Sequence, residues 1–226
     1  MKTSYKIGTR KSPLALKQVQ EVLDLLKGFY STIRLETIAI DTYGDKDKAT
    51  PISEIEGSDF FTKEIDDLLL TGEVDFAIHS AKDLPESLSD GLVIAARTKA
   101  IDPYDVLVSK QGLTLDKLPY GAKIATSSLR RKDQLKKYRD DFEIVDIRGN
   151  IEERLEKLDN SDLDAIVLAS AGLMRLGLAH KITQRITFKI LDPHPLQGAL
   201  AIVTRSKDLE LLDLLRVLDS REKVLS

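Results

Sequence analysis

The 226-residue sequence contains no cysteine and no tryptophan, and only 5% of its residues are aromatic. Without cysteine the chain can form no disulfide framework, no thiolate zinc site and no thiol nucleophile. It also lacks the thiol needed to attach a cofactor as a thioether. The scarcity of aromatic rings disfavours proteins that bind nucleic acids by stacking on their bases.

Long apolar runs and glycine-rich phosphate motifs are missing as well. No run approaches the roughly 18 residues of a membrane span, and the polar N-terminal residues do not resemble a signal peptide. We therefore expect a cytoplasmic protein. The net charge of −3 predicts no long-range attraction to nucleic acid or membrane, so anions must be bound by local clusters of positive charge. The absence of GxGxxG and GxxxxGKS/T disfavours dinucleotide-binding proteins and NTPases.

Short β-branched runs alternate with helix-period segments along the chain. Ser12 and Pro13 are typical of a helix start and Gly28 of its end. We expect strands at residues 5–7, 34–41, 75–78, 123–125, 143–147, 165–168 and 199–203. We expect helices from Pro13 to Gly28, at 60–70, from residues 126–128 to 138, after residue 150 and at 209–218. The alternation is typical of a doubly wound α/β protein with parallel strands.

The pattern occurs twice, which predicts two similar domains. We expect domain 1 to be discontinuous, with residues 1–98 and 197–226, and domain 2 to cover 105–192. Two polar, proline-containing segments, 99–104 and 193–196, would join them. Because the chain would cross twice, these segments together are expected to act as a hinge.

Positive charges recur at the turns that follow the expected strands. In an open α/β sheet, ligands bind at the carboxyl ends of the strands, where helix N-termini also attract anions. Guanidinium groups suit carboxylates, which they bind through two hydrogen bonds. A single arginine on a helix is more often a solvated surface residue, but five such turns with arginine favour a ligand with several carboxylates. The arginines concerned are Arg10, Arg130, Arg131, Arg148, Arg154 and Arg175.

An acidic residue, Asp83, stands beside Lys82 in the turn after another expected strand. Aspartate in a turn commonly caps a helix, but among cations it can transfer protons or stabilise a developing positive charge. We expect His79 to be a structural hydrogen-bonding residue rather than a base. Because His180 and His194 have no companions at ligand spacing, we expect no metal site.

Six ordered segments resemble the motifs of porphobilinogen deaminases (hydroxymethylbilane synthases) and together span almost the whole chain. They are Thr9-Arg10-Lys11-Ser12-Pro13-Leu14-Ala15-Leu16, His79-Ser80-Ala81-Lys82-Asp83-Leu84-Pro85, Thr126-Ser127-Ser128-Leu129-Arg130-Arg131, Arg148-Gly149-Asn150 with Arg154, Ala171-Gly172-Leu173-Met174-Arg175-Leu176-Gly177 and Leu196-Gln197-Gly198-Ala199. The first two domains of this family resemble periplasmic binding proteins, in agreement with the expected hinge.

The resemblance implies a transferase of tetrapyrrole (haem) biosynthesis. Such enzymes join four porphobilinogen molecules head to tail into the linear tetrapyrrole hydroxymethylbilane and release ammonia at each step. By resemblance, Asp83 assists loss of the amino group and stabilises positive charge on the pyrrole nitrogens. The six arginines would bind the carboxylates of substrate and dipyrromethane cofactor, and the site would be completed by Ser12, Lys82, Thr126, Ser128 and Gln197.

The sequence departs from the family in two places. The family's third domain carries the cysteine that holds dipyrromethane through a thioether, and this sequence ends about where that domain would begin. Four explanations stay open: a fragment, a partner chain or fused domain that supplies the third domain, a short form that holds dipyrromethane noncovalently, and an inactive relative. Ser58 and Asp59 also stand where the family has a lysine between glycines, which changes the expected lid.

Two other functions stay open. The chain could be a noncatalytic hinge-type binder of a polycarboxylate or tetrapyrrole, because it has no cysteine and an altered lid. A nucleic-acid role for the basic segment from Arg130 to Lys137 is a more distant alternative. Apart from the small-molecule substrate and a source of the third domain, we expect no partner and a monomer.

Overall fold

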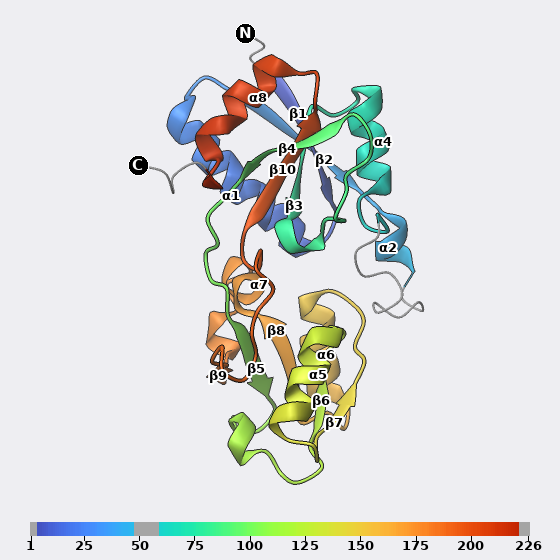
Figure 1. The fold of residues 1–226 in the computed structure, drawn as a ribbon, viewed down its shortest axis with the longest axis vertical. Coiled ribbons are helices and arrows are strands. Elements are labelled where there is room, and N and C mark those ends of the chain that lie inside the picture. Colours follow the sequence, from blue (N-terminus) through green and yellow to red (C-terminus); the bar gives the residue numbers. More distant parts are fainter. Residues whose placement is uncertain (1–3, 48–58, 222–226) are drawn as a thin grey trace. The chain divides into compact units, whose positions relative to one another are not determined.

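The computed structural model describes residues 4–47 and 59–221, which form two compact units (Figure 1). Unit 1 comprises residues 4–47, 59–101 and 199–221, and unit 2 comprises residues 102–198. The chain thus enters unit 2 after Ile101 and returns to unit 1 after Gly198. The domain and hinge boundaries expected from the sequence remain predictions. Of the altered lid segment, Ser58 lies outside the described residues and Asp59 inside them.

Unit 1 is built on a five-stranded sheet with the order β2-β1-β3-β10-β4. Strand β1 pairs in parallel with β2 and β3, whereas β10 is antiparallel to β3 and β4. The return strand β10 therefore lies inside the sheet, although it comes from the far end of the sequence (Figure 1). The strands are β1 (Ser4–Arg10), β2 (Arg34–Ile40), β3 (Phe76–Ser80), β4 (Leu92–Arg97) and β10 (Leu200–Arg205).

Helices pack on both faces of this sheet, which explains why the inner strands β3 and β10 are buried along almost their whole length. One core contains residues of α1 (Pro13–Phe29) and α8 (Leu209–Leu215), and the other contains residues of α4 (Lys63–Thr71). The short α2 (Tyr43–Lys46) follows β2. The expected helix at 209–218 ends earlier, at Leu215, and continues as a 3₁₀ turn, η4 (Arg216–Leu218).

Helix α1 shows how local sequence sets one end of a helix and tertiary packing the other. The Ser12 side chain accepts a hydrogen bond from the Ala15 amide at 3.2 Å, and Pro13 fills the first helical position, as predicted. The expected end at Gly28 is wrong. The helix continues to Phe29, because the Tyr30 amide donates to the Leu26 carbonyl and the Tyr30 hydroxyl donates to the Leu214 carbonyl on α8.

Unit 2 repeats the architecture with a second five-stranded sheet, in the order β7-β6-β8-β5-β9. Strand β6 is parallel to β7 and β8, whereas β5 is antiparallel to β8 and β9. Helix α5 contributes to the core on one face, and α6 and α7 contribute to the core on the other. The elements are β5 (Asp105–Ser109), β6 (Lys123–Ala125), α5 (Leu129–Tyr138), β7 (Glu143–Val145), α6 (Ile151–Asn160), β8 (Ala165–Ala169), α7 (Ser170–Arg175) and β9 (Gln184–Arg185).

The predicted α/β class with two similar units is confirmed, and the expected parallel pairing is found in only part of each sheet, because both sheets are mixed. Parallel pairing holds for β1 to β3 and for β6 to β8, while β10 and β5 run antiparallel to their neighbours. Apolar periodicity depends on which faces are buried and does not encode strand direction, which is why the sequence missed this. The elements α2, β4, β5, α7 and β9 were also not predicted.

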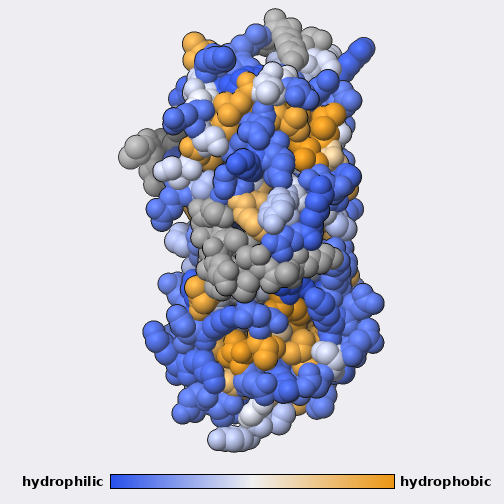
Figure 2. Space-filling model, turned by 90° about the vertical axis from the view of Figure 1, so that its right-hand side faces the viewer, coloured by the Kyte–Doolittle hydropathy of each residue, from blue (hydrophilic) through white to orange (hydrophobic). Residues whose placement is uncertain are grey.

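The surface of each unit is mainly hydrophilic on the face that Figure 2 shows, with apolar side chains gathered in smaller patches. Exposed apolar groups of this kind are ordinary for globular proteins. Among the described residues, no helix is both long enough and apolar enough to cross a membrane.

Candidate functional site

Unit 1 has a small pocket at the carboxyl ends of β1 and β3. Its volume is about 60 Å³. Three predicted site residues, Arg10, Ser12 and Asp83, line it together with His79. The Asp83 side chain is exposed at the end of the 3₁₀ turn η1 (Ala81–Asp83), and Lys82 beside it is half-buried. The remaining lining residues are Leu14, Ala15, Gln18, Phe61, Thr62, Ile78 and Ser80.

Arg10 is the last residue of β1, and its guanidinium contacts two side chains of unit 1. Its Nε lies 3.1 Å from each carboxylate oxygen of Asp45, and its Nη2 also bonds Oδ1 of that residue. The guanidinium carbon lies 4.5 Å from the centre of the Phe61 ring. Burial by itself raises the pKa of Asp45, but the hydrogen bonds and charge of Arg10 bring it below its usual value. Asp45 is therefore ionised at neutral pH.

His79 lies on β3 with only 6% of its surface exposed, and its Nε2 atom has no hydrogen-bond partner. Burial and the nearby charge of Arg10 lower its pKa to about 4, although Asp83 acts in the opposite direction. The ring is therefore uncharged at neutral pH and adds no positive charge to the pocket. The expectation that His79 makes structural hydrogen bonds is not met at Nε2.

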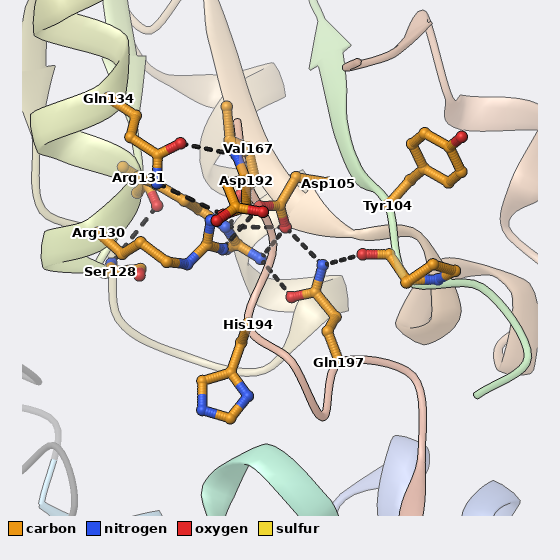
Figure 3. A network of polar contacts seen from close by, with 12 residues as sticks. Tyr104, Asp105, Ser128, Arg130, Arg131, Gln134, Val167, Asp192, His194 and Gln197 are labelled. Carbon is orange, nitrogen blue, oxygen red and sulfur yellow. Dashed lines mark hydrogen bonds and ion pairs between the residues drawn. The ribbon is translucent and has the colours of Figure 1, made fainter. Parts of the chain in front are cut away.

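Unit 2 gathers three other predicted residues, Arg130, Arg131 and Gln197, around the carboxylate of Asp105 (Figure 3). Arg130 Nη2 lies 2.7 Å from Oδ2, and Arg131 Nη2 lies 2.6 Å from Oδ1. Gln197 donates to Oδ1 at 2.9 Å and to the Pro103 carbonyl at 2.7 Å. Asp105 is completely buried, so these donors replace the water that it loses. Burial raises its pKa, but the two arginines bring it below the usual value.

The two arginines of this network differ in exposure. The Arg131 side chain is 7% exposed, and it also donates to the Val167 carbonyl at 3.2 Å and to Gln197 Oε1 at 3.4 Å. The Arg130 side chain is 26% exposed and bonds the Asp192 carbonyl through Nη1. Arg130 is therefore the more accessible of the two to a ligand from solvent.

Thr126 and Ser128 form the turn that leads from β6 into α5. Ser128 is the N-cap of α5, and its amide donates to Thr126 Oγ1 at 3.4 Å. Thr126 is completely buried, and its amide donates to the Val145 carbonyl on β7. These contacts fix the turn and place Arg130 and Arg131 in the first turn of the helix.

The last three arginines lie on or near α6 and α7. Helix α6 begins with a capping box, in which Asn150 Oδ1 accepts from the Glu153 amide and the Glu153 carboxylate accepts from the Asn150 amide. Arg148 precedes this cap and is half-buried, and Arg154 Nε donates to the Gly149 carbonyl at 2.8 Å. Arg175 ends α7 and donates to the Gly198 carbonyl at 3.0 Å, next to Gln197.

Sequence reasoning missed the two aspartates that hold the arginines. Asp105 begins β5 directly before its apolar run, and an acid at the head of a buried strand must have a partner. That position was the available signal. Asp45 lies in a polar segment with no such signal. No group of three or more histidine, aspartate or glutamate side chains that could hold a metal ion occurs in residues 4–47 and 59–221.

The chain matches a family model described as porphobilinogen deaminase, dipyromethane cofactor binding domain, over residues 5–213. It is 47% identical to the porphobilinogen deaminase of Natranaerobius thermophilus, covering 96% of this chain and 70% of that protein. It is 48% identical to that of Brevibacillus brevis, covering 95% and 70%, and 49% identical to that of Fusobacterium nucleatum, covering 96% and 73%.

Solved structures of other proteins share the fold at low sequence identity. The crystal structure of the methionine binding protein MetQ matches with a TM-score of 0.57 and 16% identity, over 96% of this chain and 89% of that one. A single-residue variant of the regulatory domain of Vibrio vulnificus OxyR2 matches with a TM-score of 0.52 and 14% identity, over 96% and 94%. At such identities the likeness shows the fold alone.

Proposed function

The chain belongs to the porphobilinogen deaminase family of transferases, and from that premise we propose that it acts as a hydroxymethylbilane synthase in tetrapyrrole biosynthesis. It would join four porphobilinogen molecules head to tail and release one ammonia at each step. The observation that carries the proposal is that Asp83 and Arg10 line one pocket at the carboxyl ends of β1 and β3. A carboxylate and a guanidinium there match a substrate that becomes cationic as it reacts and that bears carboxylates.

Asp83 would act on the reacting part of the substrate. When the C–N bond of the protonated aminomethyl group (–CH2–NH3+) breaks, its electron pair leaves with the nitrogen as ammonia. The positive charge left on the methylene carbon spreads onto the pyrrole nitrogen. A carboxylate held beside that N–H stabilises this charge. The neighbouring His79 is uncharged, so it does not oppose the developing cation.

The arginines would bind the acetate and propionate side arms of substrate and growing chain. A guanidinium offers two parallel N–H donors to a carboxylate. Arg10 lines the unit 1 pocket, and Arg130 is the more exposed arginine of the unit 2 network. We assign Arg148, Arg154 and Arg175 to the same task in unit 2. The buried Arg131, whose guanidinium nitrogens all donate to protein groups, would instead hold Asp105 and so support Arg130. Ser12, Lys82, Thr126, Ser128 and Gln197 complete the set by binding or by fixing the turns that carry the arginines.

The residues present suit the carboxylates of a dipyrromethane cofactor but not its attachment through a thioether. Arginines that bind substrate carboxylates suit the same side arms on dipyrromethane, which supplies the pyrrole carbon to which the first substrate unit is joined. A thioether link does not fit, because these 226 residues contain no cysteine. We therefore propose that the arginines hold the cofactor noncovalently, or that its sulfur link comes from outside this sequence. A noncovalent cofactor would lose the high effective concentration of a tether.

The test is a turnover assay with the purified chain, porphobilinogen and added dipyrromethane. Porphobilinogen consumption, ammonia release and linear tetrapyrrole are measured together, so that binding without chemistry is recognised. Asp83→Asn should lower kcat by about 10²-fold to 10⁴-fold, the range for a group acting directly on charge and protons in the transition state. Asp90→Asn changes an exposed aspartate later in the same loop, so it is the matched control and should leave kcat unchanged. No turnover by the wild-type chain with cofactor, or full turnover by Asp83→Asn, would overturn the proposal.

A noncatalytic binder is the second candidate, and the lack of cysteine favours it. It predicts saturable binding of porphobilinogen or a tetrapyrrole with no ammonia released. Intact-protein mass spectrometry separates the cofactor arrangements. A dipyrromethane mass present under native conditions and lost on denaturation indicates noncovalent binding.

A further inference from the structure

Two residues with no assigned role in the proposed reaction, Asp45 and Phe61, contact the Arg10 guanidinium. Asp45 on α2 accepts hydrogen bonds from Nε and Nη2, and the Phe61 ring lies against the guanidinium at 4.5 Å. Both residues are distant from Arg10 in the sequence, and both lie in unit 1. The Arg10 side chain nevertheless remains 28% exposed.

Asp45 occupies some of the guanidinium nitrogens of Arg10, and the remaining nitrogens determine what Arg10 can still bind. A guanidinium has two edges that can each donate two parallel hydrogen bonds to a carboxylate, Nε with Nη2 and Nη1 with Nη2. Asp45 occupies the first edge. Within the part of the chain that the structure describes, no residue accepts a hydrogen bond from Nη1 of Arg10. Arg131 differs, because all three of its guanidinium nitrogens donate to protein groups.

Asp45 is itself fixed in place. Thr42, which is completely buried, donates through Oγ1 to Asp45 Oδ2 at 2.8 Å, and the Asp45 amide donates to the Thr42 carbonyl at 3.1 Å. Gly44 lies so close to Phe61 that an added Cβ would overlap the ring. Helix α2, Phe61 and Arg10 therefore form one packed group.

We propose that Asp45 and Phe61 are positioning residues for Arg10, which keep its Nη1–Nη2 edge available to a carboxylate of the ligand. The proposal rests on the proposed function in that the ligand carboxylate is a side arm of porphobilinogen. A restrained arginine loses less rotamer freedom on binding than a mobile one, and ordering a long side chain weakens binding by about 2-fold to 10-fold. Asp45 also repels a ligand carboxylate through space, but salt screens this effect.

The first measurement is calorimetric titration of the whole chain with porphobilinogen at about 0.5 M salt, where the Debye length is roughly 4 Å. Asp45→Asn keeps the shape of the side chain and removes its charge, and should raise Kd about 2-fold to 10-fold. Asp41→Asn is the matched control, since Asp41 forms an exposed ion pair with Lys11 nearby. It should leave Kd unchanged. Equal or tighter binding by Asp45→Asn would refute the proposal.

A double-mutant cycle distinguishes positioning from a merely structural role. If Asp45 acts through Arg10, adding Asp45→Asn to Arg10→Gln should cause no further loss of affinity. If Asp45 only stabilises α2, the loss is the same in both backgrounds and the proposal fails. Phe61→Leu should also raise Kd, and it replaces Asp45→Asn in the cycle if that variant does not fold.

A second measurement needs no ligand, so that failure of this proposal and failure of the proposed function are distinguishable. The ¹⁵N relaxation of the Arg10 Nε group should report a rigid side chain in the wild-type chain and a mobile one in Asp45→Asn. If the wild-type chain does not bind porphobilinogen, the proposed function is wrong, and the relaxation data still decide whether Asp45 restrains Arg10. If binding occurs and Arg10 is equally mobile in both proteins, only the positioning role is wrong.

Discussion

Replacing Asp105 with asparagine removes the negative charge that Arg130 and Arg131 share in unit 2. The asparagine side chain has nearly the same size, so the substitution leaves packing almost unchanged. It retains one oxygen acceptor, but its amide group cannot accept hydrogen bonds from a guanidinium. The variant therefore isolates the charge and hydrogen-bonding contribution of the buried carboxylate.

The structure gives the expected size of the effect. Asp105 is completely buried and accepts from Arg130, from two nitrogens of Arg131 and from Gln197. Removing one partner of a buried ion pair costs about 3–5 kcal/mol, because the other charge stays buried without compensation. Arg131 is 7% exposed and meets this condition, whereas Arg130 is 26% exposed and is partly screened by solvent. We therefore expect Asp105→Asn to lower the free energy of unfolding of unit 2 by about 3 kcal/mol.

The effect should depend on pH in a defined direction. Burial raises the pKa of Asp105, but the two arginines lower it on balance below the unfolded value of about 3.9. A group whose pKa is lower in the folded state contributes stability above the unfolded pKa and loses it as pH falls towards the folded pKa. The difference between wild type and Asp105→Asn should therefore be complete at about pH 7 and shrink below about pH 4.

Native-state hydrogen exchange of the β5 and β8 amides measures the stability of unit 2 separately from that of unit 1. Asp146→Asn is the control. It breaks an ion pair between Asp146 and Lys132, which lies on the same helix, α5, as Arg130 and Arg131. The Asp146 side chain is 54% exposed. The substitution should cost no more than about 1 kcal/mol. The reasoning is refuted if the two variants lower the stability of unit 2 equally, or if the Asp105→Asn deficit does not depend on pH.

Three further predictions concern stability. Burial raises the pKa of Asp66 to about 6, so the folded state loses stability as the pH rises from about 4 through 6. Asp66→Asn should therefore raise the Tm at about pH 7.5 but not at about pH 4, as measured by circular dichroism. Gly198 has φ +88°, and a Cβ added to it would lie 2.5 Å from the Asp102 carbonyl oxygen, whereas Gly177 has φ +72° and open space around the Cβ position. Gly198→Ala should therefore lower the Tm more than Gly177→Ala does. Equal losses would show that backbone conformation alone matters. Asn150→Ala removes the capping box of α6 and should cost about 1–2 kcal/mol in urea unfolding, whereas an unchanged midpoint would show that tertiary contacts hold the start of this helix.

Much of the fold follows from local sequence. The starts of α1 and α6 are set by Ser12 with Pro13 and by the Asn150 capping box, which act between residues close together in the chain. The strands β1, β2, β3, β6, β7, β8 and β10 were found from short apolar runs, because burial on one or both faces leaves a periodic signal. The direction of β10 was not found, because antiparallel and parallel strands buried on both faces have the same composition, and β5 itself was not predicted.

The candidate site divides in the same way. The order of residues along the chain indicates that arginines and Asp83 follow the strands, which predicts the edge of the sheet where they lie. The contacts that each arginine makes are known only from the folded structure. Arg10 meets Asp45 across 35 residues, Arg131 meets Asp105 across 26, and Gln197 meets Asp105 across 92. Ion pairs and hydrogen bonds of this kind depend on distance in space, and the spacing of residues along the chain does not record that distance.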